Sequence, residues 1–198
     1  MTRIVIARHG NTFDRGDIIR RVGARSDLPL SSSGRAQALQ LAQHLSAHFD
    51  FKTAYCSELS RTRQTADTIL KAHNAELTVL PFLTEIDYGE DEGKAESEVV
   101  ARLGAKAIKL WDEAAIVPQG WLVDPDVLRS SWADFFEAHK GKGEDILVVT
   151  SNGTARFVLD VITGAEKDTP LKLRTAAYGL VTLDSGQATL KSWDRRAL

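Results

Sequence analysis

Short apolar runs separated by helix-like stretches constrain the fold of this chain most strongly. Runs of strand length cover residues 4–7, 54–56, 77–80 and 146–150. Strands that alternate with helices are typical of a largely parallel sheet with helices packed on its faces. We therefore predict an α/β fold, a three-layer sandwich in which a mostly parallel central sheet is flanked by helices.

Three helices are predicted to cover this sheet. The first follows Ser31-Ser32-Ser33, whose hydroxyls are N-cap candidates, and ends near residues 49–50. Its predicted apolar face has three- to four-residue spacing and consists of Ala36, Leu39, Ala42, Leu45 and Phe49. The second is expected over residues 58–73, and the third from Thr154 to a stop at Gly164. The tail predicts an antiparallel hairpin of residues 180–183 and 188–190 around a glycine turn.

The 198 residues are predicted to form one domain, 1–198, with a small helical insertion at about residues 86–143. This insertion begins with an acidic stretch and continues with helix-like segments that contain Trp111, Trp121 and Trp132. We expect these aromatic side chains to pack the insertion onto the sheet. Asp124-Pro125 has the form of an N-cap followed by proline at the first helical position, which predicts a further helix there.

Composition narrows the possible partners and the cellular location. A net charge of −2 gives no overall basic field that would favour nucleic acid or an anionic membrane. No run of about 18 apolar residues is present to span a bilayer, and no apolar signal-peptide core follows Met1. We therefore expect a cytoplasmic protein. Cys56 is the only cysteine, which excludes an internal disulfide and a multi-cysteine zinc site, and it is predicted to be buried in a strand.

Arg8-His9-Gly10 directly follows the first apolar run and is the first candidate for chemistry. A neutral histidine can attack phosphorus through one ring nitrogen when its other N–H is fixed by a carbonyl. The guanidinium of an arginine offers a planar fork that matches phosphate oxygens. Taken alone, the tripeptide is more typical of a structural histidine at a strand end.

Two further segments point to an anion. Ser151-Asn152-Gly153-Thr154 follows the run at residues 146–150, so parallel strands would place it at the same sheet edge as His9. Gly153 and Thr154 would open the third helix, whose free N–H groups suit an anion. Arg61 lies in the first turn of the second predicted helix, which suggests an external anion as its partner. A solvated surface charge is the alternative for Arg61.

Several segments together resemble the histidine phosphatase superfamily, also called the phosphoglycerate mutase-like family. They occur in its order and approximate spacing: Arg8-His9-Gly10-Asn11-Thr12, Leu30-Ser31-Ser32-Ser33-Gly34, Ser57-Glu58-Leu59-Ser60-Arg61-Thr62-Arg63-Gln64-Thr65-Ala66, and Glu85 followed by Gly89 and Glu92-Gly93. The resemblance spans nearly the whole chain and is weakest between about residues 94 and 143.

The resemblance implies a catalytic role for each of four residues. His9 would form a phosphohistidine, Arg8 and Arg61 would bind the phosphoryl oxygens, and Glu85 would protonate the leaving oxygen and then activate water. Two arginines can stabilise the charge of a transferring phosphoryl group without a metal. The resemblance therefore implies a small-molecule phosphate ester as substrate, phosphate as product, and no metal or other cofactor.

The substrate is expected to contact residues around this nucleophile. The predicted substrate-binding set is Asn11, Thr12, Arg15, Arg21, Gly23 and Gly153. The loop after the nucleophile also carries Arg20 and Arg25, and a charged surface loop is the alternative for any one of its arginines. We expect specificity to come from this loop, residues 14–27, and from the insertion. No feature of the sequence indicates the leaving group or the oligomeric state.

The chain departs from the family pattern at Asn152, where the family carries a second histidine. Asparagine keeps a hydrogen-bond donor of similar reach but carries no charge. Three explanations remain open: a phosphatase that tolerates Asn152, a pseudoenzyme that binds a phosphorylated ligand, or a substitution introduced to trap a ligand. A phosphatase is favoured over a phosphoglycerate mutase-type phosphotransferase, because mutases of the family tend to be longer and their full substrate-binding stretch after Glu85 is missing.

Overall fold

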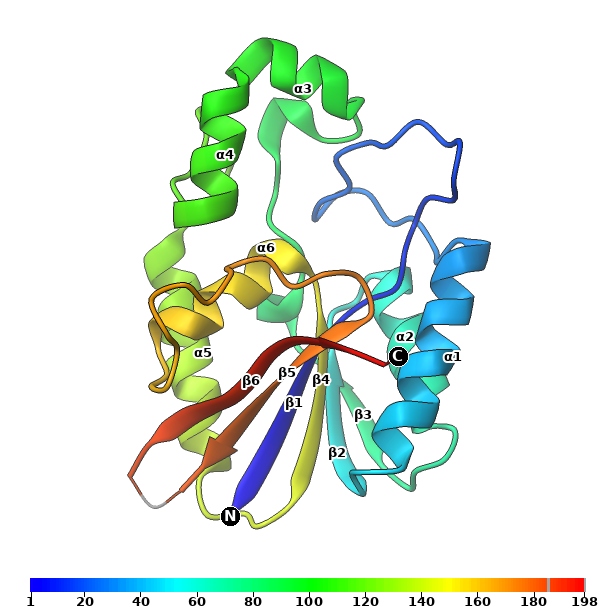
Figure 1. Ribbon diagram of the computed structural model, residues 1–198, viewed down its shortest axis with the longest axis vertical. Helices are drawn as coiled ribbons and strands as arrows, with labels where there is room; N and C mark the ends of the chain where they lie inside the picture. Colours follow the sequence, from blue (N-terminus) through cyan, green and yellow to red (C-terminus); the bar gives the residue numbers. More distant parts are fainter. Residues whose placement is uncertain (185, 198) are drawn as a thin grey trace.

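The computed structural model describes residues 1–184 and 186–197, which form a six-stranded mixed sheet with helices on both faces (Figure 1). The strands, given in the spatial order of the sheet, are β3 (Glu76–Val79), β2 (Phe51–Cys56), β4 (Asp145–Thr150), β1 (Thr2–Arg8), β5 (Ala177–Leu183) and β6 (Ala188–Arg196). The first four are parallel, whereas β5 pairs antiparallel with β1 and β6 antiparallel with β5. The predicted α/β sandwich is confirmed.

Three helices bury the two faces of the sheet: α1 (Ser32–Ser46), α2 (Ser60–Leu70) and α5 (Pro125–His139). Side chains alternate across a strand. In β1, Val5 and Ala7 therefore pack with α1 and α2, while Ile4 and Ile6 pack with α5 on the opposite face. Figure 1 shows α1 and α2 on one side of the sheet and α5 on the other. This two-sided burial explains why the parallel strands read as continuous apolar runs.

The predicted helix starts are mostly confirmed. The hydroxyl of Ser31 accepts the backbone N–H of Gly34 and caps α1, and the carboxylate of Asp124 accepts two backbone N–H groups at the start of α5. The second helix begins at Ser60 instead of residue 58. Its cap comes from the distant loop before α1, because the carboxylate of Asp27 accepts both the N–H (2.6 Å) and the hydroxyl (2.7 Å) of Ser60.

The predicted apolar face of α1 is partly wrong. Leu39 is 53% exposed and Ala36 is also exposed. The buried stripe consists of Gly34, Ala38, Leu41, Ala42 and Leu45. The sequence of α1 contains two overlapping sets of apolar residues with three- to four-residue spacing. The sheet against which the helix packs decides which of the two sets is buried.

The third predicted helix is wrong in length. The chain forms one turn, α6 (Asn152–Ala155), and then a 3₁₀ segment, η3 (Arg156–Asp160). Beyond it, Thr163 donates its N–H to the carbonyl of Ala188 (2.9 Å) and joins the edge of β6. Three successive β-branched residues, 161–163, favour this extended course. A single turn carries little dipole, so the anion site expected at the start of a long helix does not apply.

The part of the insertion before α5 lies beyond the carboxyl ends of the parallel strands (Figure 1). Its elements before α5 are η2 (Gly89–Asp91), α3 (Glu96–Leu103) and α4 (Ala105–Ala114). Trp111, Trp121 and Trp132 are buried in the same core cluster as Ile4 and Ile6 of β1. The predicted role of these tryptophans in packing the insertion onto the sheet is therefore confirmed.

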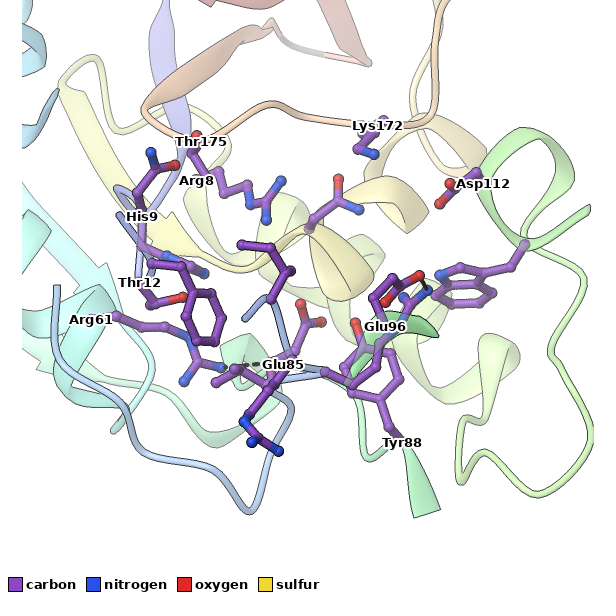
Figure 2. Close-up of a pocket in the computed structure, with 18 residues that line it drawn as sticks. Arg8, His9, Thr12, Arg61, Glu85, Tyr88, Glu96, Asp112, Lys172 and Thr175 are labelled. Carbon is purple, nitrogen blue, oxygen red and sulfur yellow. Dashed lines mark hydrogen bonds and ion pairs between the residues drawn. The ribbon is translucent and has the colours of Figure 1, made fainter. Parts of the chain in front are cut away.

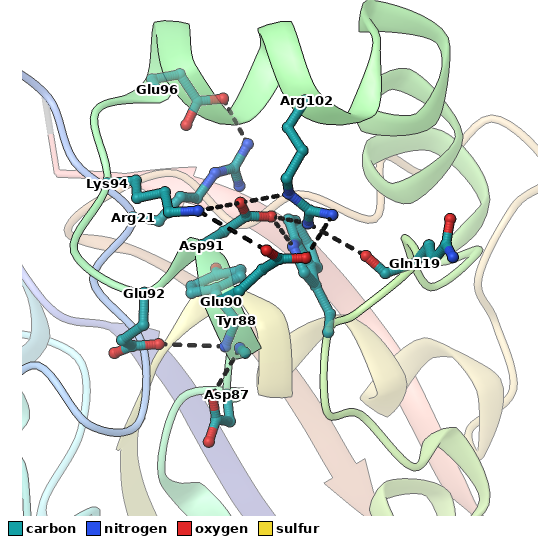
Figure 3. Close-up of polar contacts among 12 residues, drawn as sticks. Arg21, Asp87, Tyr88, Glu90, Asp91, Glu92, Lys94, Glu96, Arg102 and Gln119 are labelled. Carbon is teal, nitrogen blue, oxygen red and sulfur yellow. Dashed lines mark hydrogen bonds and ion pairs between the residues drawn. The ribbon is translucent and has the colours of Figure 1, made fainter.

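One buried carboxylate joins three parts of the insertion (Figure 3). Asp91 accepts hydrogen bonds from Nε of Arg102 (2.8 Å), from a second guanidinium nitrogen of Arg102, and from Nε1 of Trp121 (2.8 Å). The hydrogen bond from Arg102 is the main reason why the pKa of Asp91 is lowered. The contacts connect η2 with α3 and with the segment that carries Trp121.

Candidate active site

A pocket of about 490 Å³ lies at the carboxyl edge of β1 and β4 (Figure 2). The two strands pair in parallel up to Arg8 and Thr150, so the segments that follow them begin side by side. All five predicted catalytic residues line the pocket: Arg8, His9, Arg61, Glu85 and Asn152. Open α/β sheets commonly bind ligands at this edge, and the fold here brings together residues from four distant parts of the sequence.

His9 is buried and neutral at neutral pH. Its side chain is almost inaccessible, with 5% exposure, and its Nδ1 lies 2.7 Å from the carbonyl oxygen of Gly10. A carbonyl only accepts, so Nδ1 carries the hydrogen and Nε2 keeps its lone pair. Burial, together with the charges of Arg61 and Arg8, holds the pKa of His9 well below its usual 6.5. The residue therefore meets the requirements of a nitrogen nucleophile.

Two close backbone approaches hold the segment after His9 against the start of α1. A Cβ on Gly10 would lie 2.4 Å from the carbonyl oxygen of Gly34, and a Cβ on Gly34 would lie 2.0 Å from the carbonyl oxygen of Asn11. The N–H of Gly10 also donates to the hydroxyl of Thr65 in α2 (3.2 Å). Only glycine fits these two positions, which explains why the segment after His9 can lie between α1 and α2.

Arg61 is almost completely buried, with 1% exposure, so the surface alternative for it is wrong. Its two terminal nitrogens donate to backbone carbonyls of the loop before α1, including those of Ser26 (2.8 Å) and Gly23 (3.1 Å). Arg8 donates from one terminal nitrogen to the carbonyl of Leu173 (2.9 Å). The Nε atoms of Arg8 and Arg61 are buried without a partner among the described residues. Burial lowers the pKa of both guanidinium groups, and the charge of Glu85 opposes this shift.

Glu85 reaches the pocket because Gly153 leaves room for it. Its side chain is 6% exposed, and its Oε1 accepts the backbone N–H of Ile86 (2.9 Å). A Cβ on Gly153 would lie 2.2 Å from that oxygen. The hydroxyl of Thr154 donates to the carbonyl of Thr84 (2.6 Å), which holds α6 against the segment that carries Glu85. Gly153 therefore positions the carboxylate, and it is not among the residues that line the pocket.

Asn152 has a defined amide orientation. Its Oδ1 accepts the backbone N–H of Leu173 (2.8 Å), so the amide nitrogen is its remaining donor. Within residues 1–184 and 186–197, that nitrogen makes no hydrogen bond. The carbonyl of Leu173 accepts a hydrogen bond from Arg8, so the backbone of Leu173 links the side chains of Asn152 and Arg8. The result is a neutral donor beside the guanidinium of Arg8.

The predicted substrate-binding residues are only partly brought together. Asn11, Thr12 and Arg21 line the pocket. Arg15 is exposed and does not line it. Gly23 also lies outside the lining: its N–H donates to Glu92 (2.9 Å), and its carbonyl accepts from Arg61. Gly23 therefore supports the loop around Arg61.

No motif marks the individual residues of the far wall of the pocket, so the sequence predicted only the regions from which most of them come. The additional lining residues are Phe13, Ile19, Arg20, Val22, Tyr88, Glu96, Trp111, Asp112, Lys172 and Thr175. Seven of them lie in the two regions from which we expect specificity: Ile19, Arg20 and Val22 in the loop 14–27, and Tyr88, Glu96, Trp111 and Asp112 in the insertion. The one available signal was that Lys172 and Thr175 precede a predicted strand, and nothing in the sequence says that this strand, β5, pairs with β1.

Comparison with known proteins identifies the family. The sequence profile of the histidine phosphatase superfamily (branch 1) matches residues 4–196. The chain belongs to this superfamily. The resemblance derived from the sequence motifs is thus confirmed at the level of the family.

Curated relatives of this histidine phosphatase superfamily member include mutase-like proteins. Phosphoglycerate mutase-like protein 4 of Arabidopsis thaliana is 28% identical over 196 residues, which cover 96% of this chain and 84% of the relative. Other curated relatives match over only 89 residues, 45% of this chain and 40% of their own length.

Solved structures show the same fold over the whole chain. The mycobacterial glucosyl-3-phosphoglycerate phosphatase in complex with VO₃ has a TM-score of 0.80 at 20% identity, covering 97% of this chain and 98% of that one. The alpha-ribazole phosphatase from Shigella flexneri has a TM-score of 0.74 at 20% identity, covering 99% and 98%. At these identities the likeness concerns the fold.

Neither a cluster of metal-ligating side chains nor a membrane-spanning helix occurs among residues 1–184 and 186–197. No group of three or more histidine, cysteine, aspartate or glutamate side chains is placed to hold a metal ion in the part of the chain that the structure describes. No helix in that part is long and apolar enough to cross a membrane.

Cys56 is buried in β2, as predicted, and burial raises the pKa of its thiol to about 11.

Proposed function

We propose that this protein is a metal-independent phosphatase that hydrolyses a small phosphorylated metabolite through a phosphohistidine on His9. The observation that supports this most strongly is a neutral imidazole, held by the Gly10 carbonyl, in one pocket with the guanidinium groups of Arg8 and Arg61 and the carboxyl group of Glu85. Membership of the histidine phosphatase superfamily supports the same reaction.

The reaction proceeds in two displacements at phosphorus. In the first, Nε2 of His9 attacks, the bond from phosphorus to the ester oxygen breaks, and protonated Glu85 gives its proton to the leaving oxygen. In the second, the Glu85 carboxylate takes a proton from water, the water oxygen attacks phosphorus, and the P–N bond breaks. Inorganic phosphate leaves, and His9 and Glu85 return to their starting states.

The protein supplies charge to this reaction through side chains. Arg8 and Arg61 stabilise the negative charge that spreads over the phosphoryl oxygens. Asn152 adds a neutral donor through its amide nitrogen. A neutral donor contributes less than a charge-assisted one, and loss of one charge-assisted donor typically lowers the rate by about a hundredfold or more. We therefore expect slow turnover, measurable on a substrate with a good leaving group.

The neutral Asn152 also favours a second candidate, a module that binds a phosphorylated ligand without turnover. A third possibility, a phosphotransferase, follows from the name of the mutase-like relative in Arabidopsis thaliana. A mutase must protect its phosphohistidine from water and reorient a bound intermediate, whereas a phosphatase must admit water. Product analysis separates the three: free phosphate, no product, or an isomerised phosphate ester.

The test compares the purified protein with its His9→Ala and Asn152→His variants on p-nitrophenyl phosphate and a panel of metabolite phosphates. We expect the protein to release phosphate and the His9→Ala variant to lose at least about a thousandfold in kcat/KM, because no nucleophile remains. The Asn152→His variant should be faster than the unchanged protein. If the protein and the Asn152→His variant are both no faster than His9→Ala, the enzyme proposal is wrong, and saturable binding dependent on Arg8 and Arg61 would indicate a binding module.

A further inference from the structure

Lys172 lines the candidate pocket but has no role in the reaction described so far. It belongs to the segment between η3 and β5 and shares the pocket lining with Arg8, His9, Arg61 and Asn152. Figure 2 shows Lys172 on the same wall of the pocket as Arg8 and Thr175. The protein thus places a fifth cationic residue in the pocket, after Arg8, Arg20, Arg21 and Arg61.

The backbone beside Lys172 is held at three points. The N–H of Leu173 donates to Oδ1 of Asn152 (2.8 Å), and its carbonyl accepts from a terminal nitrogen of Arg8 (2.9 Å). The side chain of Leu173 is fully buried and packs with Ala155 of α6 and Ala177 of β5. Leu173 is hydrogen-bonded to both Asn152 and Arg8. The backbone of the neighbouring Lys172 therefore lies close to these two side chains.

The other cations of the pocket are already engaged with the protein. Arg61 donates to backbone carbonyls of the loop, Arg20 donates to the carbonyl of Gly93 (2.9 Å), and Arg21 forms an ion pair with Glu96 (2.5 Å). Lys172 differs from them. Its ammonium group makes no hydrogen bond and no ion pair with any residue in the described parts, 1–184 and 186–197.

Positive charge beside a phosphoryl group stabilises its oxygens in the transition state. The transferring group spreads negative charge over three oxygens, and Arg8 and Arg61 supply two guanidinium groups. Asn152 contributes only a neutral amide to the wall of the pocket on which Leu173 and its neighbour Lys172 lie. An ammonium on a flexible four-carbon stem with rotatable donors can reach an anion beside its own backbone. The ammonium group of Lys172 can therefore supply the positive charge that Asn152 does not provide on this wall.

We propose that Lys172 is a further catalytic residue, whose ammonium group binds a phosphoryl oxygen beside the amide of Asn152 and supplies the positive charge that this amide lacks. The proposal rests on the proposed phosphatase function. It assigns Lys172 to the phosphoryl group and not to the organic part of the substrate. Lys172 then compensates for a neutral side chain at position 152.

The experiment measures kcat/KM on p-nitrophenyl phosphate for Lys172→Gln, Lys172→Arg and the matched control Lys167→Gln. Lys167 is an exposed lysine on the same connecting segment, outside the pocket lining. This substrate has no anionic group besides its phosphate. We expect Lys172→Gln to lose about 10- to 100-fold, Lys172→Arg to stay within about threefold because it keeps the charge, and Lys167→Gln to equal the unchanged protein.

A double-mutant cycle shows whether Lys172 compensates for Asn152. In the Asn152→His background, assayed at a pH where the new histidine is protonated, Lys172→Gln should cost much less than in the unchanged protein, since the two charges would serve the same oxygens. Equal losses in both backgrounds would contradict the compensation. ³¹P NMR titration with inorganic phosphate adds a readout that needs no turnover: Lys172→Gln should weaken phosphate binding about tenfold.

The outcomes separate this inference from the proposed function. If Lys172→Gln keeps full kcat/KM and full phosphate affinity while His9→Ala is inactive, Lys172 has no catalytic role and the phosphatase proposal stands. If Lys172→Gln is impaired only on phosphate esters that carry an additional carboxylate, Lys172 binds the leaving group and the inference is wrong. If no variant turns over substrate, the phosphatase proposal fails, and phosphate affinity alone then decides the role of Lys172.

Discussion

At the scale of single residues, hydrogen bonds within the protein engage most of the polar atoms of the pocket side chains and leave few of them free for a ligand. Arg61 uses its terminal nitrogens on loop carbonyls, and Asn152 uses its amide oxygen on Leu173. His9 gives Nδ1–H to Gly10 and keeps only Nε2. Each of these hydrogen bonds selects one atom of a side chain for chemistry. The residue types were evident from the sequence, whereas the free atom of each became evident only from its partners.

The buried imidazole predicts an unusual response to acid. His9 has a folded-state pKa well below 6.5, the usual value that it regains on unfolding. Between the two pKa values the unfolded chain binds more protons, so the free energy of unfolding rises with pH. The contribution of His9 is complete above about pH 6.5 and is lost as the pH falls toward its folded pKa. In the phosphate-free protein, NMR titration should find the His9 ring neutral at pH 6.

The His9→Asn variant provides the assignment and the control. Its spectrum should lack the signal that stays unshifted near pH 6.5, and its free energy of unfolding should fall less between pH 6.5 and pH 5 than that of the unchanged protein. A His9 signal that titrates near pH 6.5 in the folded protein would contradict the prediction. It would also mean that His9 is not held neutral in the protein before a ligand binds.

At the scale of elements, the start of α2 determines where Arg61 lies. The N-cap residue Leu59 offers no side-chain hydrogen bond, and Asp27 from the loop before α1 replaces it by accepting from Ser60. The same loop accepts the hydrogen bond of Arg61 through the carbonyl of Ser26. The helix start and the loop therefore hold each other in place.

Removing this distant cap should weaken both stability and catalysis. We expect Asp27→Ala to lower the free energy of unfolding by about 1 kcal/mol, the usual cost of a lost N-cap, and to lower kcat/KM because Arg61 is less well positioned. Urea denaturation and p-nitrophenyl phosphate kinetics measure the two effects. Asp168→Ala is the control, since Asp168 is exposed and its side chain makes no hydrogen bond among the described residues. Equal values for the two variants would show that Asp27 does not act as a cap.

At the scale of the whole molecule, the candidate site lies at the edge of the sheet and the insertion forms the opposite wall of the pocket. The chain has a net charge of −2, but the pocket is lined by five cationic and three acidic residues. Tyr88, Glu96, Trp111 and Asp112 reach the lining from the insertion, which holds together around the buried carboxylate of Asp91. The local excess of positive charge fits an anionic ligand.

The contacts of Asp91 should support both the fold and the pocket. Asp91→Asn keeps the shape of the side chain but weakens two hydrogen bonds from Arg102 and one from Trp121. We expect a loss of about 2 kcal/mol in the free energy of unfolding and a higher KM, because the far wall of the pocket is less ordered. Urea denaturation and steady-state kinetics measure these changes. The exposed residue Asp134 provides a matched control, and an Asp91→Asn variant as stable as Asp134→Asn would contradict the prediction.

Local patterns in the sequence determined the class of fold and the main candidate site residues. Apolar runs located all four parallel strands, and capping residues located the starts of α1 and α5. The motifs around His9, Arg61 and Glu85 predicted residues that the fold does bring into one pocket. These features are readable because strand period, helix caps and motif spacing are properties of neighbouring residues.

Only the tertiary structure decided the third helix, the buried face of α1 and the far wall of the pocket. The segment after Asn152 leaves the helix because Thr163 pairs with β6, and Lys172 reaches the pocket because Leu173 bonds to Asn152 and Arg8. Such outcomes depend on hydrogen bonds and burial between residues far apart in the chain. No local pattern encodes them, since each requires that the sheet has already brought both partners together.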